Sequence, residues 1–103
     1  MDKNIGLLMD RLKDPNNDGN NDDSVYDNTL IIFINDNGGS KKNESVNIPL
    51  RGDKGDPHDG GCRVPMLVTG PGISSGNIYD KPIHSMDLIP TMLAHGGSTI
   101  PSE

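Results

Sequence analysis

The sequence predicts an α/β fold in which a helix, a strand, a long loop, a second strand and a second helix follow one another. Apolar residues recur at helical spacing near both ends of the chain, at 4–13 and 85–94. Two short apolar runs lie between these segments, at 29–34 and 64–69. Because ligands in open α/β sheets sit at the carboxyl ends of strands, we look for functional side chains directly after each run.

The first helix is expected over residues 4–13, with Asp2 as its N-cap. Pro15 limits its continuation, since proline removes a helical hydrogen bond and clashes with the preceding turn. One side of the helix is apolar at positions i, i+3, i+4 and i+7, namely Ile5, Leu8, Met9 and Leu12.

A polar tract at 14–26, rich in Asp and Asn, is predicted to be an exposed loop inserted after this helix. Its residues 14–19, DPNNDG, match the first half of a calcium-binding loop. Such a loop needs a bidentate carboxylate at its twelfth position, which here is Val25. We therefore expect a solvated acidic loop at 14–26, with a calcium site of the EF-hand type as the alternative.

The run at 29–34 is continuous and β-rich, as in a strand buried on both faces in a parallel sheet. It ends at a turn that contains Asp36 and Asn37. A carboxylate and an amide carbonyl are hard oxygen ligands, which suit Ca²⁺ or Mg²⁺ better than Zn²⁺. The alternative is that Asp36 and Asn37 serve only as turn residues.

The stretch from Ser40 to Arg63 is predicted to be a long irregular loop, a length that in compact domains is commonly functional. Within it, Lys54 lies among glycines. Glycines let backbone N–H groups approach an anion, and a lysine adds a point charge. The alternative is a flexible loop with scattered charges. Beyond it, Gly70 ends the strand at 64–69, and Ser85 is expected to cap the last helix.

Composition excludes several classes of protein. The chain has 103 residues and a formal net charge of −6, which argues against a broad nucleic-acid surface. No apolar run approaches the ~20 residues of a membrane span, and residues 1–4 show no signal peptide. A single cysteine, Cys62, excludes an internal disulfide framework. Positive charge is concentrated within 41–63, where an anion could be received.

Taken together, the motifs resemble the sulfatase family of the alkaline-phosphatase-like superfamily. The resemblance covers residues 1–103 apart from the polar tract, and it identifies an internal or C-terminal segment of the catalytic domain. The blocks that carry it occur in the family's order: NTLIIFINDNGG at 28–39, NIPLRGDKG at 47–55, DGGCRVP at 59–65, GPG at 70–72 and HSMDLIPTML at 84–93.

The resemblance implies a mixed or parallel sheet sandwich with long catalytic loops, and the hydrolysis of sulfate esters. Asp36 and Asn37 look like two of the family's calcium ligands, with Mg²⁺ as the alternative ion. Lys54 looks like the catalytic lysine that binds the sulfate group, and His58 lies where the same loop could approach substrate. The role of His84 stays open.

The sequence departs from the family at the nucleophile. The family makes formylglycine from a Cys or Ser in a C/S-x-P/A-x-R motif, whereas Cys62 is followed by Arg63, Val64 and Pro65. The isolated chain is therefore expected to be inactive and to need the remaining part of a sulfatase domain. Two other functions stay open: a phosphoryl or phosphonate hydrolase of the same superfamily, and a non-catalytic fragment that binds calcium or a sulfated ligand.

Overall fold

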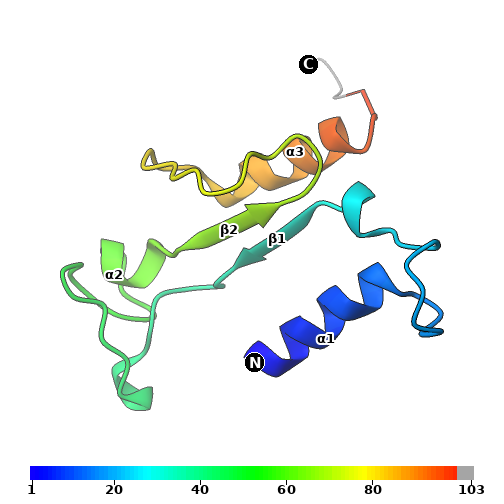
Figure 1. Ribbon diagram of the computed structural model, residues 1–103. Coiled ribbons are helices and arrows are strands. Elements are labelled where there is room, and N and C mark those ends of the chain that lie inside the picture. The colour runs from blue at the N-terminus through cyan, green and yellow to red at the C-terminus, as the bar shows by residue number, and fades with distance from the viewer. Residues whose placement is uncertain (100–103) are drawn as a thin grey trace. The chain divides into compact units, whose positions relative to one another are not determined.

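The computed structural model describes residues 1–99 and divides into two compact units, Met1–Ile31 with the chain from Thr69 onward, and Ile32–Val68. Its elements follow the predicted order of helix, strand, loop, strand and helix (Figure 1). In chain order they are α1 (Asp2–Lys13), η1 (Tyr26–Asn28), β1 (Ile31–Ile34), η2 (Lys41–Asn43), α2 (Asp59–Cys62), β2 (Met66–Thr69), η3 (Ser85–Asp87) and α3 (Leu88–His95), where η denotes a 3-10 helix.

In the first unit, α1 begins two residues earlier than predicted. Met1 is its N-cap, and Asp2 lies in the first turn, where the positive end of the helix dipole stabilises its carboxylate. The helix ends at Lys13 with Asp14 as its C-cap, directly before Pro15, which cannot continue a helix. The polar loop then returns to the helix, because the N–H of Val25 donates to the carbonyl of Leu12 at 2.9 Å.

His84 caps the 3-10 helix η3, which leads into the last helix α3, where the sequence suggested Ser85 as the cap. The Nδ1 atom of His84 accepts a hydrogen bond from the N–H of Met86 at 3.1 Å. In return, the carboxylate of Asp87 accepts from the N–H of His84 at 2.8 Å. This reciprocal pair is a capping box, and it gives His84 a structural role at the start of η3.

The strands β1 and β2 pair in a two-stranded sheet, and their arrows in Figure 1 point in opposite directions. Antiparallel pairing fits the mixed sheet of the predicted α/β class and differs from the parallel sheet suggested by the run at 29–34. A parallel pair would need a crossover connection, whereas residues 35–65 fold into glycine-rich turns. β1 is half-buried rather than buried on both faces, because within residues 1–99 only β2 pairs with it.

The stretch at 40–63 is more ordered than predicted. It contains the short helices η2 and α2, which the sequence does not predict. Local hydrogen bonds form both: the Ser40 hydroxyl caps η2 by accepting from the N–H of Lys42, and the carbonyl of His58 accepts from the N–H of Gly61 at 2.8 Å in α2. Helical turns of this length carry no amphipathic pattern that a sequence could display.

Burial is confined to the second unit. Within residues 1–99 no apolar side chain is buried, and the buried positions are three glycines, Gly38, Gly60 and Gly61. Large apolar side chains remain exposed, including Leu67 at 69% and Ile78 at 94%. No helix in the described part of the chain is long and apolar enough to cross a membrane.

Candidate functional site

Two candidate oxygen ligands, Asp36 and Asn37, follow each other in the turn after β1. The Oδ1 atom of Asp36 accepts a hydrogen bond from the N–H of Asn37 at 3.0 Å. The Nδ2 group of Asn37 donates to the carbonyl of Gly38 at 3.0 Å, which fixes the amide so that its Oδ1 atom faces away from that bond. Among residues 1–99, no hydrogen bond engages Asp36 Oδ2 or Asn37 Oδ1. These two oxygens are therefore available as ligands for a hard cation.

Two oxygens alone fall short of a complete metal site. Ca²⁺ takes 6–8 oxygen ligands, and Mg²⁺ demands six in octahedral geometry. Within the described residues, no three His, Cys, Asp or Glu side chains are grouped closely enough to hold a metal ion. The chemistry of the pair fits Ca²⁺, and the further ligands would have to come from outside these residues.

Buried glycines form a backbone contact between the turn after β1 and α2. The N–H of Gly38 donates to the carbonyl of Gly61 at 2.9 Å. A Cβ atom added at Gly38 would collide with the carbonyl oxygen of Gly60 and lie 3.1 Å from the Cα of Gly61. This close approach of two backbones requires glycine at position 38.

A backbone hydrogen bond of Lys54 holds the lysine loop against the turn after β1. Its N–H donates to the carbonyl of Gly39 at 3.1 Å, so the loop that carries the lysine is fixed to the turn that carries Asp36 and Asn37. The side chain is exposed. Lys54 forms none of the ion pairs found among residues 1–99, whereas Lys41 pairs with Asp53 and Arg63 pairs with Asp59. Its ammonium group is thus free to receive an anion.

The Nδ1 edge of the His58 ring faces the loop that carries this residue. Its Nδ1 atom lies 3.7 Å from the Oδ1 atom of Asp56 and is buried without a hydrogen-bond partner in the described chain. The side chain as a whole is 40% exposed. The accessible part of the ring is therefore the part remote from Nδ1, and only that part could touch a ligand.

Asn47 connects the two loops and was not singled out from the sequence. Its Oδ1 atom accepts from the N–H of Gly39 at 2.9 Å. Its Nδ2 group donates to the carbonyls of Gly39 at 2.9 Å and Gly52 at 3.2 Å. The sequence offers no local signal for this, because an asparagine before Pro49 is ordinary turn chemistry; its place in the NIPLRGDKG block was the one available hint.

The carboxylates of the loop at 14–19 accept hydrogen bonds from the backbone of the same loop. The carboxylate of Asp14 accepts from the N–H groups of Asp18 at 3.1 Å and Gly19 at 2.9 Å. Asp18 in turn accepts from the N–H of Asn20 at 2.8 Å. The bond between Asp18 and Asn20 is an Asx turn, whereas Asp14 accepts from residues four and five positions further along the loop.

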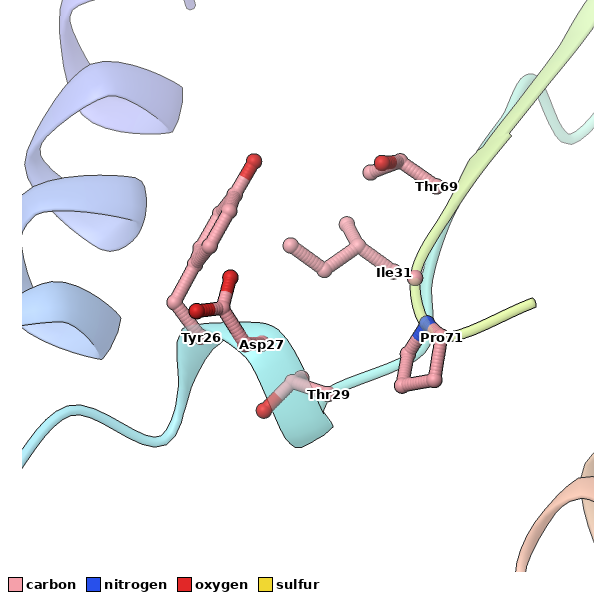
Figure 2. Close-up of a pocket in the computed structure, with 7 residues that line it drawn as sticks. Tyr26, Asp27, Thr29, Ile31, Thr69 and Pro71 are labelled. Atoms are coloured by element: carbon pink, nitrogen blue, oxygen red, sulfur yellow. The ribbon is translucent and has the colours of Figure 1, made fainter. Parts of the chain in front are cut away.

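A pocket of about 260 Å³ lies in the first unit, and its lining contains none of the residues predicted to form the site. Figure 2 shows Tyr26 and Asp27 on η1 and Ile31 and Thr69 on the strands around it. Asp27 is the one charged residue in its lining, and a negative charge disfavours an anionic ligand. The pocket is therefore a poor receptor for a sulfate group.

Comparison with known proteins identifies the family of this chain. The family model described as Sulfatase matches residues 1–98. The chain belongs to the sulfatase family. This sulfatase segment is 38% identical to a sulfatase of Formosa agariphila, over 99% of the segment and 19% of the relative. It is 34% identical to an arylsulfatase of Hemicentrotus pulcherrimus, over 96% of the segment and 17% of the relative.

A solved structure shares the fold of the segment. The crystal structure of Ps i-CgsB in complex with k-i-k-neocarrahexaose matches it with a TM-score of 0.81 and 38% identity, over 97% of the segment and 21% of that protein. This likeness confirms the predicted α/β class. The sulfatase segment spans about a fifth of the length of the proteins it matches.

Proposed function

We propose that this chain forms part of the active site of a sulfuric ester hydrolase. In this proposal Asp36 and Asn37 contribute two calcium ligands, and Lys54 binds the sulfate group. The observation that carries the proposal is the hydrogen bond between the N–H of Lys54 and the carbonyl of Gly39. This bond attaches the loop that carries Lys54 to Gly39, two residues beyond Asn37. A cation held by Asp36 and Asn37 and an anion held by Lys54 would therefore be neighbours.

The lysine would act through its charge. The sulfate group carries negative charge on its oxygens, and a cation placed against those oxygens stabilises the transition state where water is excluded. The ammonium group of Lys54 suits this role because no carboxylate among residues 1–99 is paired with it. His58 would flank the substrate with the exposed part of its ring.

The calcium ion would be shared with the rest of the domain. When bound, a divalent cation neutralises charge on the sulfate and orients the reacting groups. Asp36 and Asn37 supply a carboxylate and an amide oxygen, and Asn37 in place of a histidine supports calcium over zinc. Mg²⁺ is the alternative ion, and it would tolerate this pair only within an octahedral set.

The nucleophile would come from another part of the enzyme. No C/S-x-P/A-x-R motif occurs in this sequence, and the exposed Cys62 has its Sγ atom 3.6 Å from the carbonyl of Asp56. We therefore propose that the isolated chain is inactive. The exposed apolar side chains of both units would pack against the remaining part of the sulfatase domain.

The substrate proposed for the complete enzyme is a sulfate ester of a carbohydrate. Support comes from the matched structure, which holds k-i-k-neocarrahexaose, and from a human relative named N-acetylgalactosamine-6-sulfatase, 32% identical over the whole segment. An exposed lysine in an open loop is accessible to a large substrate as well as to a small one.

The test is hydrolysis by the complete protein that contains this segment. Release of sulfate from an aryl sulfate and from a sulfated oligosaccharide is compared with release of phosphate from an aryl phosphate, with and without calcium. We expect calcium-dependent sulfate release and no turnover by residues 1–103 alone. Faster phosphate release would favour the phosphoryl hydrolase, and calcium binding without any turnover would favour the non-catalytic binding fragment.

A further inference from the structure

Asn47 makes three hydrogen bonds with one amide group, and all three go to the backbone of the two loops that carry the proposed site. Two of them engage both polar groups of Gly39, at 2.9 Å each. The third reaches the carbonyl of Gly52 at 3.2 Å. The half-buried amide thus uses both of its N–H donors and accepts one hydrogen bond through its oxygen.

The carbonyl of Gly39 accepts hydrogen bonds from both Asn47 and Lys54. It accepts from the Nδ2 group of Asn47 at 2.9 Å and from the N–H of Lys54 at 3.1 Å. Asn47 and Lys54 therefore share one acceptor, which lies two residues beyond Asn37. The third bond of Asn47 holds Gly52, two residues before Lys54, so the lysine loop is tied on both sides.

Neighbouring side chains leave little room for a side chain at position 39. A Cβ atom placed at Gly39 would lie 2.5 Å from the Cβ of Ser45 and 3.1 Å from the Oδ1 atom of Asn47. If the amide were removed, the half-buried N–H of Gly39 would lose its hydrogen-bond partner, and an unpaired polar group shielded from water is unfavourable. The turn would then move to find a new partner, and the Lys54 backbone would move with it.

We propose that Asn47 is a positioning residue, which sets the place of the Lys54 ammonium relative to the Asp36–Asn37 ligand pair. The proposal rests on the function proposed above for Lys54. Asn47 touches neither substrate nor metal; it acts through the backbone of Gly39 and Gly52. Displacement of a catalytic group by about 1 Å lowers the rate by ~10²-fold, so the removal of Asn47 should reduce kcat by that order.

The experiment measures kcat and KM of the complete protein at saturating calcium, well below each variant's melting temperature. The variants are Asn47→Ala, Lys54→Ala and the double variant, and the control is Asn43→Ala. Asn43 is exposed in the same stretch of chain, and its side chain makes no hydrogen bond within residues 1–99. We expect Asn47→Ala to lower kcat ~10²-fold and Asn43→Ala to leave it unchanged.

The double variant separates positioning from a general structural role. If Asn47 acts through Lys54, then adding Asn47→Ala to Lys54→Ala should cause little further loss, because coupled residues are not additive. A loss equal to the product of the two single losses would overturn the proposal, and so would a normal kcat for Asn47→Ala. Activity retained by Lys54→Ala would instead overturn the proposed function itself.

A second substitution covers the case in which Asn47→Ala does not fold. Asn47→Asp keeps the shape and the acceptor for the N–H of Gly39, but it turns an oxygen toward the carbonyls of Gly39 and Gly52. We expect a folded protein with a loss of kcat at least as large as that of Asn47→Ala. If neither variant folds, Asn47 is a folding residue and the positioning role is wrong.

Discussion

The backbone N–H of Gly38 donates a hydrogen bond to the carbonyl of Gly61 at 2.9 Å, although the two glycines lie far apart in the sequence. Both are buried in a chain whose described part buries no apolar side chain. The buried positions of this sulfatase segment are therefore backbone contacts between glycines. We expect substitutions at these glycines to affect both local stability and the proposed site.

Substitution of Gly38 should destabilise the protein. The added methyl group of Gly38→Ala would collide with the carbonyl of Gly60, and overpacking of this kind costs about 1–3 kcal/mol. Urea unfolding of the complete protein measures the change in the free energy of unfolding. Gly6→Ala is the control, since a Cβ at Gly6 meets no atom within 4 Å and alanine favours a helix by ~0.5–1 kcal/mol. Equal stability of the two variants would contradict the packing argument.

Substitution of Lys54 should reduce turnover far more than stability. The side chain is exposed and fills no core, so Lys54→Ala should leave the melting temperature close to that of the wild type. Loss of one charge directed at the transferring group typically costs ~10²–10³ in kcat. Steady-state hydrolysis of an aryl sulfate measures the loss, and excess calcium should not restore it.

Lys42→Ala is the matched control for that experiment. Lys42 is exposed on the neighbouring loop and forms none of the ion pairs found within residues 1–99. Lys42→Ala changes the net charge by the same amount as Lys54→Ala but should leave kcat unaltered. If both variants lost the same activity, the effect would come from general electrostatics and not from a sulfate contact. A loss that only followed a lower melting temperature would make Lys54 structural.

Substitution of Asp36 should impair activity by a route that calcium can offset. Asp36→Ala removes a ligand and so raises the calcium concentration needed for half-maximal activity. Excess calcium should therefore restore part of the turnover. Activity is titrated against calcium for Asp36→Ala and for the exposed control Asp22→Ala. Identical calcium curves for the two variants would remove Asp36 from the metal site.

The isolated chain should bind calcium weakly. Two adjacent oxygens provide a minor share of the 6–8 that the ion takes, and the carboxylates at 14–18 are already used by their own loop. Calorimetric titration of residues 1–103 should show no micromolar site. If one appears, separate Asp14→Ala and Asp36→Ala variants would locate it in the polar loop or at the end of β1.

The isolated chain should also be marginally stable. Exposed apolar side chains such as Leu67 and Ile78 contribute little to folding, and strands with open edges invite association. Circular dichroism during heating should show a broad, concentration-dependent transition. A sharp cooperative melt from a monomer at low concentration would show that the segment folds without the rest of the domain.

The sequence by itself determined the order and type of the main elements, because the periodic apolar patterns at 4–13 and 85–94 and the β-rich runs at 29–34 and 64–69 are local properties of the chain. It also identified the family through ordered motifs. Tertiary structure alone decided the antiparallel pairing of β1 with β2, the His84 cap and the three bonds of Asn47. Each of these depends on where the backbone returns after a turn, which neither local preference nor apolar spacing specifies.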